Sequence, residues 1–338
     1  MLKGFYLEAK PLFFALKKCK VMNTIAMRFI KNLKREWSWY LFILIPVFGV
    51  IMFNFYPLVR TILMSFQNNR GTFIGTVNYE ILFTDKFFTL SAKNTVYMGI
   101  LGILLNLPLA FILAVMLNRV NFGRSFFKVL FLLPLIMSMV SVAYIFKFIF
   151  NPEPGGVMNY FIALFNIPPQ KWLTSPGQAR ESVVLMHLWK GIGYNVILFF
   201  AGLQSVPNEY YEAASIDGAN EAHKIWHITL PCMKNTLTFV YITTSINLLK
   251  RFTDVYAVGR EQGEPGGSLM TIILYIYRKS FSTTFSKDLG VGSAASIVLF
   301  AIILCLTAIN FSLTERPDTG ISRKGISWKG LSEKWRRR

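Results

Sequence analysis

Six long runs of apolar residues alternate with polar, charge-bearing segments along the chain. The runs are Trp39–Phe55, whose apolar character continues past Pro57 to Phe66, then Asn94–Leu117, Phe127–Phe148, Ser182–Leu203, Thr236–Val258 and Leu289–Leu313. Each run is close to the ~20 residues that an α-helix needs to cross about 30 Å of hydrocarbon. A helix also pairs its backbone N–H and C=O groups internally, which lipid requires. The pattern therefore predicts an all-α integral membrane protein with about six transmembrane helices.

The composition favours lipid rather than water as the solvent for most of the chain. Of its 338 residues, 53% are hydrophobic and 16% are charged, and the mean hydropathy is +0.44, whereas soluble proteins carry about 25% charged residues. In a soluble protein, the net charge of +19 would suggest nucleic-acid binding. Here the basic residues lie between the apolar runs and at both ends, where they orient membrane spans and attract anionic lipid. We therefore expect membrane lipid, and no nucleic acid, as a partner.

The distribution of basic residues also predicts the orientation of the spans. The segments 1–38 and 314–338 are strongly basic, and an even number of spans puts both termini on one side, which these charges identify as the cytoplasm. The loops 118–126 and 204–235 then also face the cytoplasm. Three loops face outward, namely 67–93, 151–181 and 259–288.

This orientation predicts three regions in a multi-pass protein of the bacterial plasma membrane. They are a basic cytoplasmic N-terminal segment (1–38), a six-helix membrane domain (39–313) that includes the cytoplasmic loop 204–235, and a basic cytoplasmic tail (314–338). Residues 20–35 place apolar side chains on one helical face and polar or basic ones on the other. That pattern fits a helix lying on the cytoplasmic leaflet, and equally a helix packed on the rest of the protein.

The loop 204–235 is longer than a connection between two membrane helices requires. Pro207 stops the preceding helix, and Asn208 is placed to cap the next one, whose first turn is acidic as the helix dipole favours. Gly218 ends this helix, a second short amphipathic segment follows, and Pro231 breaks it before the fifth span. We predict a two-segment helical elbow in the cytoplasm, and a simple connecting loop is the alternative.

Eight residues of this loop resemble the EAA signature of binding-protein-dependent ABC importer permeases. They are Glu212, Ala213, Ala214, Asp217, Gly218, Ile228, Leu230 and Pro231. The resemblance extends over most of residues 40–313. Four further segments are similar to the sugar-importer branch, the MetI-like permeases of the maltose and glycerol-3-phosphate type: Asn94-Thr95, Leu133-Pro134, Trp189-Lys190-Gly191 and the Gly-Leu-Gln-Ser-Val-Pro run that ends at Pro207.

The resemblance implies the transmembrane domain of an ABC type I importer. It implies that the chain and a second permease subunit form the translocation pathway for a sugar or oligosaccharide. An extracytoplasmic solute-binding protein would deliver the solute, and two cytoplasmic ATPase subunits would hydrolyse ATP. The elbow would dock in a groove on the ATPase, so the eight signature residues would couple ATP hydrolysis to transport. The chain departs from the family pattern at Arg251–Asp254, Gly263–Pro265 and Phe146, which leaves the solute open.

Several other chemistries find no support in the sequence. No GxxxxGK[ST] motif occurs, so the chain has no phosphate-binding loop, and we expect a transport subunit that is not an enzyme and needs no cofactor. His223 and His227 are spaced to share a metal ion, but no third ligand accompanies them, and we predict no metal site. Cys19, Cys232 and Cys305 form no CxxC pair, so we expect reduced thiols.

Polar and aromatic residues within the spans are candidates for the solute pathway, because polar groups are costly in lipid and tend to face a wet cavity. They are Asn106, Ser138, Tyr144, Trp189, Lys190, Tyr194, Asn195, Asn247 and Arg251. Amides and hydroxyls suit a hydroxyl-rich solute, aromatic rings suit a sugar ring, and the cations suit an anionic group. For each single residue the alternative is a hydrogen bond between helices or, for the cations, snorkelling. For the group as a whole we favour the pathway.

Two other function classes compete with the permease. An ATP-independent secondary transporter or channel has no reason to project the elbow, and such carriers often contain internal repeats, of which none is clear here. A membrane enzyme would need paired acids or a histidine cluster within the spans, which are nearly free of both. The importer permease is therefore the function that the sequence favours.

Overall fold

The computed structural model describes residues 37–314 of the chain. These residues are almost entirely helical, with one isolated antiparallel bridge between Gln67 and Phe73, which confirms the all-α prediction. The helix predicted at 20–35, the basic tail and Cys19 lie outside the described residues. The chain divides into two compact units between Leu63 and Met64.

The first unit contains one long apolar helix. Its segments are α2 (Trp37–Val50), the π-helical turn η1 (Ile51–Phe55) and α3 (Tyr56–Ser65), whose last residues belong to the second unit. Pro57 has no N–H and its ring crowds the carbonyl four residues before it, so the helix widens into the π-turn just ahead of it. Residues Trp39–Ser65 form a candidate span of 27 residues. This confirms that the first apolar run continues past Pro57.

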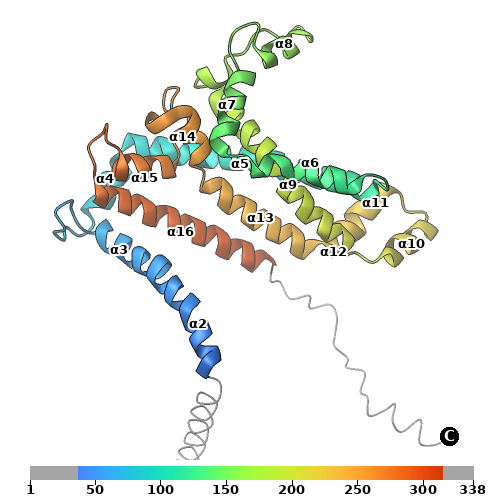
Figure 1. Cartoon of the computed structure of the whole chain (residues 1–338), viewed down its shortest axis with the longest axis horizontal. Coiled ribbons are helices and arrows are strands. Elements are labelled where there is room, and N and C mark those ends of the chain that lie inside the picture. The colour runs from blue at the N-terminus through green and yellow to red at the C-terminus, as the bar shows by residue number, and fades with distance from the viewer. Residues whose placement is uncertain (1–36, 315–338) are drawn as a thin grey trace, which may run out of the picture. The chain divides into compact units, whose positions relative to one another are not determined.

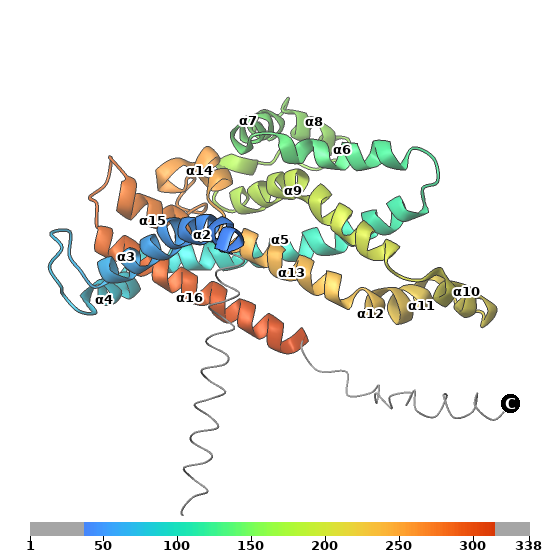
Figure 2. The same cartoon turned by 60° about the horizontal axis from the view of Figure 1, so that its bottom comes forward.

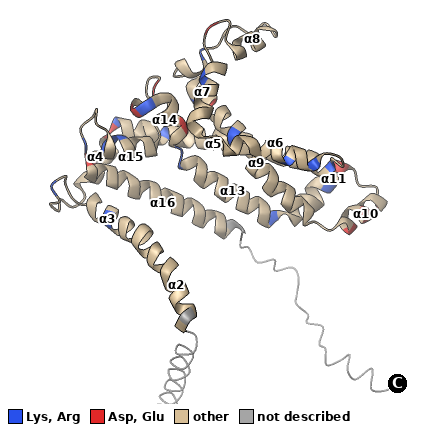
Figure 3. Cartoon of the chain, in the orientation of Figure 1, with Lys and Arg blue, Asp and Glu red and all other residues tan. Residues whose placement is uncertain are grey.

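Long apolar helices form the centre of the second unit (Figure 1). They are α5 (Lys86–Arg119), α9 (Ala179–Gln204) and α16 (Leu289–Thr314), and each contains a candidate membrane span. Ala110 and Ala114 of α5 lie in one buried cluster with Phe199 of α9, and the small alanine side chains let the two helices pack closely. Acidic and basic residues lie mostly near the ends of these helices, and α16 carries none (Figure 3).

The third predicted span is not one straight helix. It consists of α6 (Arg124–Ile136) and α7 (Met139–Ile149), which are bent by 97°. The span predicted over Phe127–Phe148 is therefore either a broken span or a re-entrant loop, and not one straight helix. Met137 and Ser138 have extended backbones that end α6, and the Lys190 ammonium donates a hydrogen bond of 2.9 Å to the freed carbonyl of Leu135. A cation at this position also interacts favourably with the helix dipole.

The fifth predicted span is broken as well. α13 (Lys234–Leu249) ends, and α14 (Thr253–Gly259) begins after a three-residue interruption, whereas the sequence predicted one helix over Thr236–Val258. Arg251 lies in the interruption with its side chain buried, and its carbonyl accepts a hydrogen bond of 3.0 Å from Thr271 Oγ1. The carbonyl therefore finds a partner outside its own helix, as a helix end requires.

The number of spans follows from these breaks. Within residues 37–314, four helices are long and apolar enough to cross a membrane, or five if the bent pair counts as one span. The predicted six is not confirmed, because α13 has 16 residues and a straight span needs ~20.

Short helices lie at two opposite ends of the second unit (Figures 1 and 2). The elbow end holds α10 (Asn208–Ile216), α11 (Glu221–Lys224), the π-turn η3 (Ile225–Thr229) and α12 (Leu230–Cys232). The other end, called the distal end below, holds α4 (Val77–Thr84), α14, the short helix η4 (Arg260–Gln262) and α15 (Ile272–Phe281). The loop between α7 and α9 contains α8 (Val157–Ala163) and η2 (Trp172–Thr174).

Contacts at each end join loops that the sequence assigned to the same side of the membrane. At the distal end, Tyr275 Oη donates a hydrogen bond of 2.7 Å to Asp85, and Asn94 Nδ2 donates to the carbonyls of Gly267 (2.9 Å) and Met270 (3.1 Å). At the elbow end, Arg119 forms an ion pair with Glu221. The Asn94-Thr95 motif thus fixes the loop that precedes α15.

Candidate functional site

The elbow begins with a proline rather than with the predicted asparagine cap. Pro207 is the residue that flanks α10, in an extended conformation (φ −61°, ψ 133°), and Asn208 is already the first helical residue, so the assignment of Asn208 as the cap is wrong. Proline fixes φ near this value, which sets up the turn into the helix. Asn220 caps the second segment instead, because its side chain accepts a hydrogen bond of 2.8 Å from the His223 N–H.

Gly218 ends the first segment, as the sequence predicts. Its φ is +80°, a conformation that glycine adopts without the steric cost that a Cβ imposes. The N–H groups of Gly218 and Ala219 donate to the carbonyls of Ser215 (3.2 Å) and Ala214 (2.9 Å). This pair of bonds is the Schellman motif, and it satisfies carbonyls that the helix end leaves free.

The signature residues lie on and beside an exposed surface of the elbow. Glu212, Ala213, Asp217, Gly218 and Pro231 are exposed, and Ala214, Ile228 and Leu230 are partly buried. Large apolar side chains stand exposed among them, which the sequence analysis did not single out. Ile216 is 87% exposed and Trp226 is 69% exposed. An exposed apolar surface with a polar rim is typical of a protein–protein contact.

Both ends of the elbow are anchored in the helix bundle. Val206 and Met233 flank the elbow and lie buried in the core cluster that α5 and α9 share. Tyr211 Oη and Thr229 Oγ1 are 2.9 Å apart and hold the two elbow segments together. A displacement of the elbow must therefore be passed to the bundle, because packed interiors transmit strain.

Glu221 links the elbow to the end of α5. Its carboxylate lies 2.5 Å from Arg119 and 3.0 Å from Lys224. The hydrogen bond from Lys224, its charge and the Arg119 guanidinium together hold the pKa of this exposed carboxyl below its ordinary value.

The two histidines of the elbow stack on each other. The rings of His223 and His227 are 3.9 Å apart between centroids, and His227 Nδ1 lies 3.1 Å from the His223 carbonyl. Within residues 37–314 no group of three or more histidine, cysteine or acidic side chains is arranged to hold a metal ion. The free thiols of Cys232 and Cys305 are exposed there.

A pocket of about 220 Å³ lies among α5, α9 and α13, and we call it the central pocket. Five of the nine predicted pathway residues line it: Asn106, Lys190, Tyr194, Asn195 and Asn247. The structure therefore brings together polar residues from three predicted spans. His187 and Thr244 also line the pocket, and the sequence analysis did not include them in the pathway.

The amides in the central pocket differ in their partners. Asn195 is buried, and its Nδ2 donates to Asn106 Oδ1 at 2.6 Å and to Thr244 Oγ1 at 3.0 Å. These bonds join α5, α9 and α13, as the helix-to-helix alternative supposes. Asn247 is exposed to the pocket. The two asparagines, which the sequence treated as equivalent, therefore have different surroundings.

The other four predicted pathway residues lie elsewhere. Ser138 is exposed at the bend between α6 and α7. Trp189 packs against Phe146, with ring centroids 5.6 Å apart. Tyr144 lines a separate pocket at the distal end. Arg251 is buried beside Asp254 at 2.7 Å, so its guanidinium already has an anionic partner within the chain.

Comparisons with known proteins agree with this arrangement. Residues 106–317 match the family model described as binding-protein-dependent transport system inner membrane component. The arabinooligosaccharides transport system permease protein AraP of Halalkalibacterium halodurans is 32% identical over 284 residues, which cover 82% of this chain and 86% of the relative. The lactose transport system permease protein LacF of Rhizobium radiobacter is 31% identical over 287 residues, which cover 83% of this chain and 95% of the relative.

A solved structure shares the fold. It is the crystal structure of a bacterial ABC transporter involved in the import of the acidic polysaccharide alginate, and one of its chains superimposes with a TM-score of 0.76 at 25% identity. The match covers 86% of this chain and 99% of that chain. A second structure of an alginate ABC transporter, in complex with a periplasmic protein that holds an alginate pentasaccharide, gives a TM-score of 0.74.

Proposed function

The chain belongs to the binding-protein-dependent transport system inner membrane components, and from this premise we propose how it couples ATP hydrolysis to the import of a sugar. As a member of this family it is a membrane-embedded transport subunit of the ABC importer type. Nothing in its relatives or its fold favours an ATP-independent carrier or channel. Its proposed partners are a second permease subunit, two cytoplasmic ATPase subunits and an extracytoplasmic solute-binding protein.

The observation that carries the coupling proposal is the exposed apolar surface of the elbow. Ile216 in the first elbow segment and Trp226 in the second expose most of their surface. Burial of apolar surface contributes roughly 25 cal/mol per Å², so a groove on the ATPase that covers these side chains would hold the elbow firmly. The eight signature residues are the proposed coupling contacts. Because Val206 and Met233 anchor the elbow in the bundle core, movement of the ATPase would reach the spans.

The proposed orientation puts the elbow end in the cytoplasm and the distal end outside. The strongly basic segments at both termini and the basic residues Arg119 and Arg124 near the elbow support this assignment. The elbow can meet a cytoplasmic ATPase only in this orientation. A solute delivered from outside would then enter at the distal end.

The central pocket is the proposed solute site within the spans. Tyr194 and Asn247 line it, and amides and hydroxyls offer both donors and acceptors to a hydroxyl-bearing solute. A volume of about 220 Å³ is below the ~300–1,000 Å³ typical of complete ligand sites. The second permease subunit would therefore complete the site, which agrees with a pathway formed between two permeases.

The proposal is tested by purifying the chain with its co-expressed partner permease, ATPase and solute-binding protein. ATP hydrolysis by the complex in lipid vesicles is then measured with arabinotriose, lactose or sn-glycerol 3-phosphate. We expect at least one sugar to stimulate hydrolysis when the binding protein is present, together with uptake of that sugar into vesicles. Uptake that continues without the ATPase would contradict the proposed function.

A further inference from the structure

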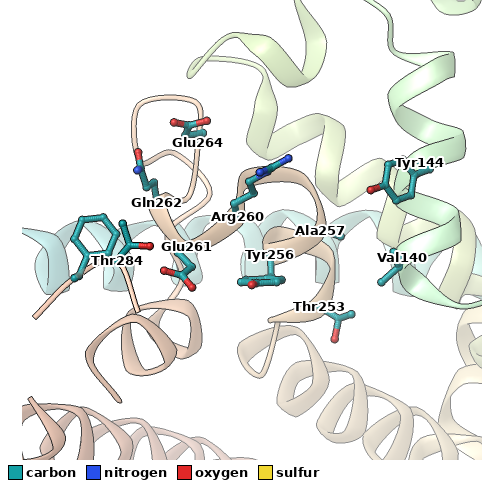
Figure 4. A pocket seen from close by; sticks show the side chains of 11 residues that line it. Val140, Tyr144, Thr253, Tyr256, Ala257, Arg260, Glu261, Gln262, Glu264 and Thr284 are labelled. Carbon is teal, nitrogen blue, oxygen red and sulfur yellow. The ribbon is translucent and has the colours of Figure 1, made fainter. Parts of the chain in front are cut away.

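A second and larger pocket lies at the distal end of the unit, and we call it the outer pocket (Figure 4). Its volume is about 870 Å³, which is within the range of complete ligand sites. Side chains of α7, α14, η4, Glu264 and the segment after α15 line it, and it shares no lining residue with the central pocket. Different side chains therefore line the two pockets.

Two tyrosines give the outer pocket its aromatic surface. Tyr144 projects from α7 and is 69% exposed. Tyr256 on α14 is held in place by Phe252 and Tyr277, whose ring centroids lie 5.3 Å and 5.2 Å from its own. A rigid aromatic ring with an open face can cover the apolar C–H face of a sugar at a low cost in conformational entropy.

Polar side chains of both charges lie beside the tyrosines. Arg260, Glu261 and Glu264 line the outer pocket together with the amide of Gln262. Figure 4 shows Tyr144 and Glu261 on opposite sides of Tyr256 and Arg260. Glu261 is oriented by a hydrogen bond of 2.6 Å from Ser282 Oγ. Because acids and a base share the pocket, it has no strong preference for an anion, whereas its many donors and acceptors suit neutral hydroxyl groups.

Arg260 occupies a backbone conformation that suits only glycine. Its φ is +52° and its ψ is −159°, a combination that costs other residues about 1–3 kcal/mol. The tight loop imposes this conformation, since the Glu264 N–H donates to the Gly259 carbonyl at 2.9 Å. A glycine at position 260 would satisfy the same loop without strain. The arginine thus lowers the stability of the loop. Its side chain lines the pocket and has no hydrogen-bond or ion-pair partner among residues 37–314.

We propose that the outer pocket is a second binding site for a neutral oligosaccharide, separate from the central pocket. Tyr144 and Tyr256 cover sugar rings, and Arg260 donates hydrogen bonds to sugar hydroxyls that Glu261 and Gln262 also bind. The inference rests on the proposed function as a sugar permease. It adds a site at which the solute is held before it reaches the spans.

The test exploits the strain at Arg260. Arg260→Gly removes both the guanidinium and the strain, so the variant should melt at the same temperature as the wild type or higher. A structural role for the arginine would lower the melting temperature. In the assembled complex without the solute-binding protein, calorimetric titration should show that Arg260→Gly weakens binding of arabinotriose or lactose about 5- to 150-fold. Tyr256→Ala should weaken it further, while Arg70→Gly, an exposed arginine outside the pocket, should leave it unchanged.

The outcomes separate this inference from the function on which it rests. If the wild-type complex imports a sugar but binds neither arabinotriose nor lactose in the titration, the outer site does not exist and the importer function stands. The outer site is also refuted if Arg260→Gly and Tyr256→Ala bind sugar as the wild type does. Tighter binding of sn-glycerol 3-phosphate than of either sugar would refute the preference for neutral solutes. Failure of the complex to import any solute would count against the permease function itself.

Discussion

Arg251 and Asp254 form a buried ion pair of 2.7 Å in the interruption between α13 and α14. Their side chains are 1% and 3% exposed, and His187 of α9 lies 3.2 Å from the same carboxylate oxygen. Transferring two charges from water into such a site is expensive, and only their mutual attraction offsets that cost. Asp254 therefore connects the broken fifth span to α9 through His187, and its buried charge depends on Arg251 as a partner.

Removal of one partner should destabilise the protein more than removal of both. Asp254→Asn leaves the Arg251 charge buried and unpaired, and should lower the free energy of unfolding by about 3–5 kcal/mol. The double variant Arg251→Met with Asp254→Leu should lose less free energy of unfolding than Asp254→Asn. Denaturant unfolding of the purified protein gives these values. A matched control is Glu221→Gln at the exposed pair with Arg119, which should cost less than about 1 kcal/mol. Equal losses at the two pairs would contradict the prediction.

The sequence predicts the elements whose signal is local. Gly218 ends α10 because the turn after a helix needs a positive φ, and glycine marks such a turn in any context. The apolar runs locate α5, α9 and α16 because a span is defined by its own composition. The prediction of Asn208 as the helix cap was wrong because Pro207 occupies the capping position. Both residues are compatible with a helix start.

The features that the sequence could not supply depend on partners far along the chain. The bend of 97° between α6 and α7 lies inside the predicted span Phe127–Phe148, whose overall hydropathy carries no sign of it. Asn195 bonds to Asn106, 89 residues away, and only the fold brings the two together.

The break at Arg251, by contrast, had a local signal in the sequence. Two opposite charges three residues apart within an apolar run seldom lie in an uninterrupted lipid-facing helix.

The elbow can be tested at Ala213. This residue is exposed on α10, so Ala213→Leu should leave the fold intact and block close approach of the ATPase. We expect loss of ATPase co-purification and of uptake at an unchanged melting temperature. Ser215→Leu is the matched control, because position 215 lies about 200° around the helix from position 213. Normal ATPase binding by Ala213→Leu would remove the elbow from the coupling interface.

The orientation can be tested by cysteine labelling in a chain without native cysteines. Glu221→Cys places a thiol in the elbow, and Lys171→Cys places one in the loop before α9. In intact cells a membrane-impermeant maleimide should label position 171 and not position 221, and both should react after the cells are opened. Labelling of position 221 in intact cells would reverse the topology.

Asp85 should make the stability of the distal end depend on pH. Burial alone would raise the pKa of this carboxyl. The hydrogen bonds from Tyr275 and from the Phe87 N–H, together with the Lys279 ammonium, outweigh burial and hold the pKa below its ordinary value. A depressed pKa in the folded state stabilises the protein above the ordinary pKa and loses that effect as the pH falls through the folded value. The difference in melting temperature between wild type and Asp85→Asn should therefore be constant near neutral pH and shrink below about pH 4. A difference that grows on acidification would contradict this sign.

Asn195 and Asn247 should respond differently to the same substitution, although both line the central pocket. Asn195→Ala leaves the buried Asn106 amide without its partner and removes the bond to Thr244, so it should cost about 1–3 kcal/mol of stability and lower the melting temperature of the complex. Asn247 is exposed to the pocket, so Asn247→Ala should instead raise the solute concentration for half-maximal uptake, by roughly 5- to 150-fold if one solute hydroxyl loses its partner. Both quantities are measured on each variant. If Asn247→Ala lowers only the melting temperature, its amide bonds neighbouring helices and does not contact the solute.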